Sequence, residues 1–204
     1  MLADLIDDWD YVLQFWFGDS PDDGEVAAKY SALWWGKSAD NDQLIWAKFS
    51  HRVEQASAGI LTPWLEHPPG RLAAIILIDQ FRRNIYRDKP EAFAEDELAR
   101  RWCREGLDNN VDTELRPIER VFFYLPLEHS ESLKDQEDSM RLFTQLRDEA
   151  SAEMRPLFNP FYDFARRHYD IIKRFGRFPH RNAILARESS EEEIRFLREP
   201  GSSF

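Results

Sequence analysis

The most restrictive feature of this sequence is a segment near its middle, residues 71–86, which opens with the longest purely apolar run of the chain, Leu72–Ile78. A helix over this segment is apolar on all sides for its first two turns. Because a helix without a polar face has to be buried all round, the segment predicts a helix at the centre of the fold. Seven apolar residues are too few to cross a bilayer, so the run does not predict a membrane span.

Apolar residues elsewhere recur at the three- and four-residue spacing of amphipathic helices, whereas the strict alternation that marks a β-strand is nearly absent. Glycine and proline fall mostly between these periodic segments and mark their ends. The expected helices cover residues 4–17, 25–35, 38–58, 71–86, 91–108, 115–125, 132–150, 158–175 and 190–198. The pattern predicts an all-α protein of about eight to nine helices in a single domain, residues 1–204.

Composition narrows the class of protein. The net charge is −11 over 204 residues, which disfavours general binding to nucleic acid or to an anionic membrane surface. Met1–Asp8 is acidic where a secretory signal would be basic, and the single cysteine, Cys103, cannot form an intrachain disulfide. These features predict a cytoplasmic protein without a membrane or nucleic-acid partner. Cys103 lies in a helical pattern and is interpreted as an inert core residue.

The sequence contains no phosphate-binding loop, no dinucleotide-binding glycine fingerprint, no serine-hydrolase elbow and no zinc-binding histidine pair. We therefore predict no cofactor and no metal site. Polar residues instead gather in four segments that interrupt apolar faces. Each of these segments has a functional and a structural interpretation.

The first segment is Asp79–Arg87, at the C-terminal end of the predicted central helix. Asp79 and Arg83 are four residues apart, as are Gln80 and Asn84, so each pair shares a face of a helix. Asp79 continues the buried line of that helix, and a buried carboxylate has to be paired. The segment predicts either a ligand-binding group formed by Asp79, Gln80, Arg83 and Asn84 or a purely structural ion pair.

The second and third segments are centred on histidines. His129 lies between Glu128 and Glu131, and flanking carboxylates stabilise the protonated imidazole, as an acid or base catalyst requires. The alternative is a solvated turn that precedes the next helix. His168 lies in the apolar stripe of the expected helix 158–175. There it is either a catalyst or a hydrogen-bonded core residue.

The fourth segment is basic. Residues 166–187 contain seven lysines or arginines and one acidic residue. Within it, Arg177, His180, Arg181 and Asn182 lie in a turn shaped by glycine and proline, and they predict a site for a carboxylate or a phosphate. The alternative is that the segment packs against the acidic remainder of the chain.

Together these segments resemble the bacterial domain-of-unknown-function 924 family. The resemblance is carried by Val12–Gly18, Asp79–Arg87, Tyr124–Glu131 with Gln136, His168–Asn182 and Leu185–Arg187. It covers nearly the whole chain and implies a tetratricopeptide-like, all-helical fold, but it implies no activity.

Two positions depart from the family pattern. Arg82 stands where the family usually has proline, and this alters the turn after the central helix. Ala186 stands where the family usually has glycine, so a side chain replaces the residue that best tolerates a positive φ.

Three functions are compatible with these observations. The leading one is binding of a small anionic molecule or a peptide in a concave groove lined by arginine, histidine and asparagine side chains. The second is an enzyme of the hydrolase or lyase type, in which His129 or His168 is the general base and a nearby carboxylate orients it. In the third, the polar segments serve only the packing of a scaffold. The sequence leaves the oligomeric state open.

Overall fold

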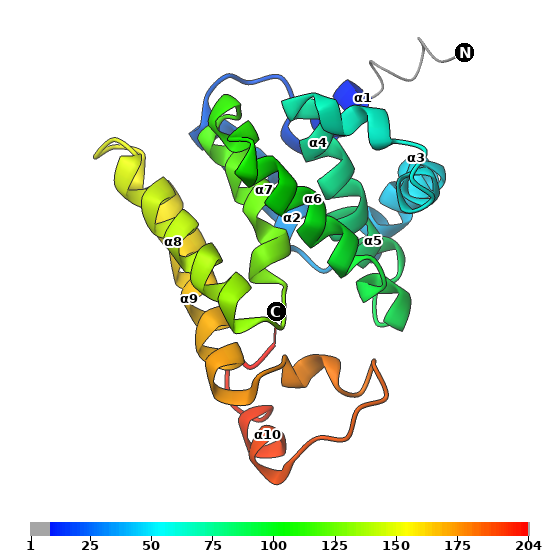
Figure 1. Ribbon diagram of the computed structural model, residues 1–204, viewed down its shortest axis with the longest axis vertical. Helices are drawn as coiled ribbons and strands as arrows, with labels where there is room; N and C mark the ends of the chain where they lie inside the picture. The colour runs from blue at the N-terminus through cyan, green and yellow to red at the C-terminus, as the bar shows by residue number, and fades with distance from the viewer. Residues whose placement is uncertain (1–8, 204) are drawn as a thin grey trace.

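A computed structural model describes residues 9–203, which form helices and turns with no β-strand among them (Figure 1). The α-helices are α1 (Trp9–Phe17), α2 (Asp23–Trp35), α3 (Ala39–Ser57), α4 (Pro68–Ile75), α5 (Arg82–Ile85), α6 (Asp96–Asp108), α7 (Pro117–Glu128), α8 (Leu133–Glu149), α9 (Arg155–Phe175) and α10 (Glu191–Phe196). The all-α prediction is therefore confirmed over the described residues. The first part of the helix expected over 4–17 lies outside them. The finer expectations, a tetratricopeptide-like array and a single domain over 1–204, stay predictions.

Local sequence explains where several helices begin and end. The Ser132 hydroxyl accepts a hydrogen bond from a backbone N–H in the first turn of α8, and Ser190 does the same for α10. The sequence offers two serine–glutamate pairs with capping-box spacing at this helix, Ser189 with Glu192 and Ser190 with Glu193. The second pair forms the capping box. Gly18 follows α1 with φ +69°, the left-handed conformation that glycine permits. Gly36 ends α2 differently, with φ −79°.

The central apolar segment is not one regular helix. It comprises α4, a π-helical turn over Ile76–Phe81, and the short helix α5. The N–H of Arg82 donates to the carbonyl of Leu77, five residues back, where an α-helix would use the fourth. The extra residue in this turn changes the register of the side chains that follow. Asp79 lies inside the turn and is fully buried, so the fold carries a carboxylate into its centre.

Helix α7 extends past the point at which we expected it to end. The prediction stopped before Pro126, because proline cannot donate a helical hydrogen bond, yet α7 continues to Glu128. The buried side chain of Gln136 on α8 donates from Nε2 to the carbonyls of Glu128 and Ser130, at 2.6 and 2.7 Å. This tertiary contact satisfies carbonyl groups at the end of α7 and holds the following turn in place.

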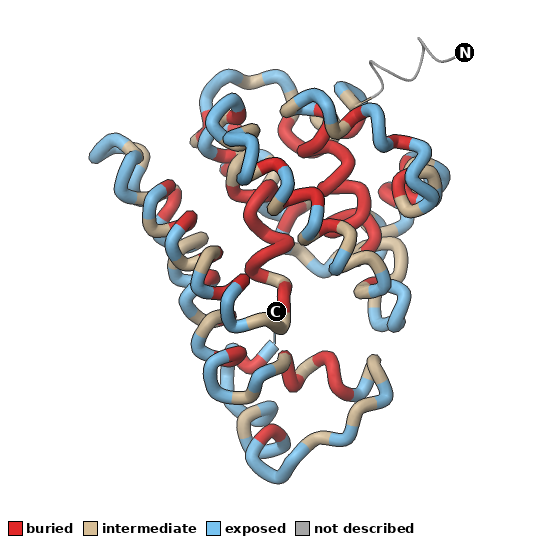
Figure 2. The backbone as a smooth tube through the Cα atoms, viewed as in Figure 1, coloured by how far each residue is buried: buried red, intermediate tan, exposed pale blue. Residues whose placement is uncertain are grey.

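The core extends continuously from α1 to α9, with α4 and α7 at its centre (Figure 2). Helices α8 and α9 pack along each other as a long hairpin beside this centre (Figure 1). A second, smaller cluster is formed by Ile171, Ile172 and Phe178 and lies where the chain leaves α9. The C-terminal segment thus returns to the main body close to the end of α7. This return brings two distant parts of the sequence to one site.

Candidate functional site

A carboxylate and an imidazole form the centre of the candidate site. Asp79 comes from the π-helical turn, and His129 is the residue that follows α7. The Nδ1 atom of His129 lies 2.9 and 3.0 Å from the two carboxylate oxygens of Asp79. An ionised carboxylate only accepts hydrogen bonds, so Nδ1 of His129 carries the proton. The two residues are fifty positions apart, and helix packing alone brings them together.

The Asp79 carboxylate is held by two further donors. Gln80 Nε2 donates to Oδ2 over 2.6 Å, and Arg83 Nη2 lies 3.3 Å from Oδ1. Burial disfavours the charged carboxylate, but His129, Arg83 and Gln80 outweigh it and hold the pKa of Asp79 well below its usual range. Asp79 is therefore ionised although it has no contact with solvent.

His129 is neutral at neutral pH. Burial lowers the pKa of His129 below its ordinary 6.5, against the effect of Asp79, and the nearby Arg83 acts in the same direction as burial. With the proton on Nδ1, the second ring nitrogen, Nε2, has a free lone pair. No described residue makes a hydrogen bond with Nε2 of His129, and 16% of the side chain is exposed. The ring therefore combines a partly exposed side chain with a basic nitrogen that has no partner among the described residues.

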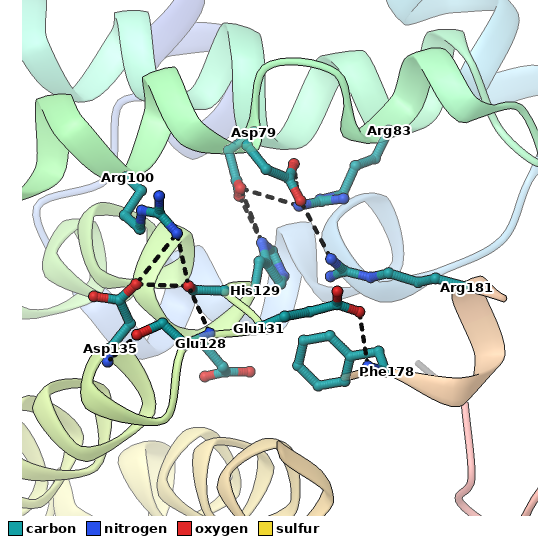
Figure 3. A network of polar contacts seen from close by, with 12 residues as sticks. Asp79, Arg83, Arg100, Glu128, His129, Glu131, Asp135, Phe178 and Arg181 are labelled. Atoms are coloured by element: carbon teal, nitrogen blue, oxygen red, sulfur yellow. Dashed lines mark hydrogen bonds and ion pairs between the residues drawn. The ribbon is translucent and has the colours of Figure 1, made fainter. Parts of the chain in front are cut away.

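A cleft of about 380 Å³ opens at His129. Its wall is built from the 3-10 turn Pro90–Phe93, the start of α6, the residues after α7 and the C-terminal segment around Arg181. The lining residues are Pro90, Phe93, Ala94, Asp96, Glu97, Arg100, His129, Ser130, Glu131, Arg181 and Leu185. Figure 3 shows the Arg181 side chain extending toward His129, below Asp79 and Arg83.

Two arginines share the carboxylate of Asp96, one of the lining residues of this cleft. Arg83 Nη2 donates to Oδ1 over 2.8 Å, and Arg181 Nη1 donates to Oδ2 over 3.3 Å. Burial and the neighbouring Arg83 lower the pKa of Arg181 to about 10, so it remains charged at neutral pH. The network thus runs without interruption from His129 through Asp79, Arg83 and Asp96 to Arg181 (Figure 3).

Glu131 anchors the segment that carries Arg181. Its carboxylate accepts two hydrogen bonds from Arg187, at 2.7 and 2.9 Å, and one from the Phe178 backbone N–H at 2.8 Å. Burial would raise the pKa of Glu131, but these donors lower it below its usual range. Asn182 accepts from Arg187 Nε and donates to Ser189. Glu131 and Asn182 therefore fix the C-terminal segment against the end of α7.

A second carboxyl–imidazole pair lies behind the first. His168 Nδ1 is 3.1 Å from Glu128 Oε1 and donates to the Phe164 carbonyl at 2.9 Å. Burial, together with the negative charge of Asp79, raises the pKa of Glu128 to about 8, so its carboxyl is mainly protonated at neutral pH. Burial lowers the pKa of His168 well below its ordinary value. The two imidazole rings are 6.2 Å apart, but neither Glu128 nor His168 lines the cleft.

The remaining candidates lie at other places. Asn84 donates to Asp42 on α3 and takes no part in the cleft wall. Arg177 pairs with Glu193 at the C-terminal capping box and takes no part in the cleft wall. His180 packs beside Phe178, and burial and Arg181 lower its pKa to about 4. Of the predicted residues, His129, Glu131 and Arg181 line the cleft, and Asp79, Gln80 and Arg83 support them from behind.

Sequence reasoning missed Phe93, Asp96, Arg100 and Ser130. Asp96 and Arg100 are four residues apart at the start of α6, but such a pair is common on exposed helices and does not indicate a site by itself. Ser130 donates to Asp135 over 2.6 Å and accepts from Arg100 over 3.1 Å. Only the folded chain shows that these residues line the same cleft as His129.

Two other features are less suited to chemistry. A hollow of about 420 Å³ lies between the start of α7 and the α8–α9 hairpin, but it contains no histidine. Its Arg116 is bound to Asp23, and its Arg120 is bound to backbone carbonyls. Cys103 is fully buried, and burial raises the pKa of its thiol far above its usual range, as an inert core cysteine requires.

Over residues 9–203, no group of three or more histidine, cysteine or acidic side chains is placed to hold a metal ion. Within the same range, no helix combines the length and the hydrophobicity needed to cross a bilayer.

The fold and site define an all-helical protein with a buried carboxylate–imidazole pair at the wall of a cleft. The chain belongs to the DUF924 family of bacterial proteins of unknown function, whose family model matches residues 12–201. A solved structure, that of the protein of unknown function ATU0120 from Agrobacterium tumefaciens, is 34% identical in sequence. It matches with a TM-score of 0.72 over 87% of this chain and 99% of that one. Comparison with curated proteins gives no match.

Proposed function

We propose that this protein is an enzyme of the hydrolase or lyase type that acts on a small ligand in the cleft, with His129 as the general base. The observation that carries the proposal is the orientation of His129. Its Nδ1–H is bound to ionised Asp79, and its Nε2 is left without a partner among the described residues at a cleft wall. A neutral imidazole fixed in this tautomer accepts a proton at Nε2.

Asp79 stabilises the protonated form of His129. When Nε2 takes a proton, the imidazole becomes a cation, and the carboxylate 2.9 Å from Nδ1 stabilises that charge. Asp79 stays ionised throughout because Arg83 and Gln80 remain bound to it.

The proton comes from a bound water or from the ligand itself, not from a protein nucleophile. Ser130 is adjacent in sequence, but its hydroxyl donates to Asp135 and not to His129. No serine, threonine or cysteine between residues 9 and 203 is hydrogen-bonded to His129. An acyl-enzyme mechanism is therefore disfavoured, and His129 acts directly on water or on an acidic proton of the ligand.

Binding of a small anionic molecule or peptide, without turnover, is the second candidate. It is favoured by Arg181 and Arg100, which give the cleft cationic groups beside His129. Both candidates use the same cleft, so they differ only in whether His129 transfers a proton. The cleft holds arginine and histidine side chains, whereas both predicted asparagines are bound elsewhere.

The test is a screen of the purified full chain against small esters, amides and phosphoesters, followed by substitution of the base. His129→Gln is expected to lower kcat/KM for any accepted substrate about 10²–10⁴-fold, the usual contribution of a general base. Arg177→Gln is the matched control outside the cleft and is expected to leave kcat/KM unchanged. Unchanged turnover in His129→Gln would reject the proposal. Saturable ligand binding without turnover by the wild type would replace it with the binding function.

A further inference from the structure

We propose that the ligand of this cleft carries a single carboxylate, which Arg181 binds through the Nε–Nη2 edge of its guanidinium group. The inference rests on the cleft of the proposed function and adds the chemical class of the ligand. It starts from the setting of one side chain. Arg181 lines the cleft, but only 7% of its side chain is exposed.

Two phenylalanine rings pack against the Arg181 guanidinium. Its central carbon lies 4.7 Å from the ring centre of Phe93 and 4.5 Å from that of Phe178. Cation–π contacts engage the face of the guanidinium, so its hydrogen-bonding edges stay available to acceptors. One of these edges is used, since Nη1 donates to Asp96.

The other edge has no acceptor. Nε of Arg181 is buried without a hydrogen-bond partner, and no described residue accepts a hydrogen bond from Nη2. A buried donor without an acceptor is costly, so a group that supplies two acceptor oxygens to this edge relieves the cost. Nε–H and Nη2–H are parallel and match the two oxygens of a carboxylate.

The charges around Arg181 favour a group with one negative charge. Asp96, Glu97 and Glu131 line the same cleft, and only Arg100 and Arg181 are cationic there. Glu97 is exposed and forms no ion pair within residues 9–203, so its charge is not neutralised by a neighbour. The Glu97 carboxylate would repel a doubly charged phosphate at Arg181 more strongly than it would repel a carboxylate. A neutral amide would lack the charge-assisted hydrogen bonds.

The position of Arg181 places the ligand for His129. Both side chains line the cleft, and the guanidinium extends toward the imidazole (Figure 3). A carboxylate held on Arg181 therefore places the remainder of the ligand in the cleft that His129 also lines. Arg181 is in this respect a binding and positioning residue, and His129 is the residue that reacts.

The first experiment uses the wild-type chain and needs no variant. Acetate and benzoate are titrated against ¹⁵N-labelled protein while the side-chain Nε–H signal of Arg181 is followed, and benzamide and inorganic phosphate are titrated in parallel. The two carboxylates are expected to shift this signal saturably and to slow its exchange with water, whereas benzamide and phosphate are not. A tighter response to phosphate, or no response to either carboxylate, would overturn the inference.

A second experiment separates this inference from the proposed function. Arg181→Lys keeps the charge but loses the paired donors, and it is expected to weaken benzoate binding about tenfold or more. Arg177→Lys, whose guanidinium binds Glu193 outside the cleft, is the control and should bind as the wild type does. His129→Gln should still bind benzoate. If it binds but the wild type turns nothing over, only the proposed function fails. If binding is lost in Arg100→Lys and kept in Arg181→Lys, the inference fails.

Discussion

The two carboxyl–imidazole pairs of this protein have similar composition but opposite protonation. Asp79 beside His129 is ionised, whereas Glu128 beside His168 is mainly protonated at neutral pH, although both carboxyls are buried. The difference follows from their neighbours. Asp79 accepts hydrogen bonds from Gln80 and Arg83, while Glu128 has no arginine or lysine paired with it among the described residues and lies near the negative charge of Asp79.

The comparison indicates which pair is suited to chemistry. A carboxylate has to be ionised to stabilise a protonated histidine. Burial alone has the opposite effect, since it favours the neutral form of Glu128. A neighbouring cation is needed to keep the charge in place, and Arg83 supplies it only to the pair at the cleft. Glu128 and His168 instead join helices α7 and α9 and contribute to their packing.

Replacing each carboxyl with the corresponding amide is expected to give the largest difference between the two pairs. Asp79→Asn removes the charge that stabilises the His129 cation and is expected to lower kcat/KM about 10²-fold or more. Glu128→Gln resembles the protonated acid already present and should leave kcat/KM within about threefold. Steady-state kinetics of both variants at pH 7 make the measurement. Equal losses in the two would show that the pairs do not differ in the way proposed.

Removing the cation tests the physical cause of the difference. Arg83→Met leaves Asp79 and Asp96 without their shared donor and is expected to lower the free energy of unfolding by about 3 kcal/mol, the cost of breaking a buried ion pair. Arg174→Met is the control, because its ion pair with Glu192 is about half exposed and contributes little. Urea unfolding at neutral pH measures both. A loss in Arg83→Met no larger than in the control would mean that Arg83 does not sustain the charge of Asp79.

The pH dependence of stability tests the protonation of Glu128, the carboxyl of the second pair. The pKa of Glu128 is raised from 4.5 to about 8 in the folded state, so the folded chain holds a proton that the unfolded chain releases between these pH values. Stability from this group is therefore complete below pH 4.5 and falls as pH rises toward 8, by at most about 1.4 kcal/mol per pH unit.

Glu128→Gln cannot titrate, so the stability of the wild type relative to this variant should decrease as pH rises from about 5 to 8. Subtracting the two unfolding free energies at each pH cancels the contribution of the other titrating groups. A difference that stays constant with pH, or that changes with the opposite sign, would show that Glu128 is ionised in the folded chain.

Helix periodicity predicted the all-α fold because most of its signals are local. Capping serines, glycine stops and apolar stripes act within a few residues, and Ser132 and Ser190 accordingly cap helices near the predicted positions. The structure differs from the predicted helices where tertiary contacts dominate. The carbonyls at the end of α7 are satisfied by Gln136, so the helix passes Pro126, and the central segment adopts a π-helical turn at Asp79.

The site was predictable only in part. The unusual placement of Asp79, His129 and Arg181 in the sequence indicated polar chemistry. It did not indicate that His129 and Arg181 line one cleft, with Asp79 bound to His129 behind the cleft wall. Arg177 and Arg181 are equivalent by sequence, yet Arg177 pairs with Glu193 and Arg181 packs against two phenylalanine rings. Which arginine is available to a ligand depends on contacts made by segments far apart in the chain.

The smallest expected effect is that of Ala186→Gly on the free energy of unfolding. The φ of Ala186 is +51°, as the glycine usual at this family position would allow, and the strain of an L-residue there is about 1–2 kcal/mol. Glycine relieves this strain but increases the entropy of the unfolded chain, at a cost of about 0.4–1 kcal/mol. Ala186→Gly should therefore stabilise the fold by about 0.5–1 kcal/mol in urea unfolding. Because Ala186 is exposed and does not line the cleft, kcat/KM should not change. A stabilised variant with altered kcat/KM would mean that the C-terminal segment sets the geometry of Arg181 through its backbone.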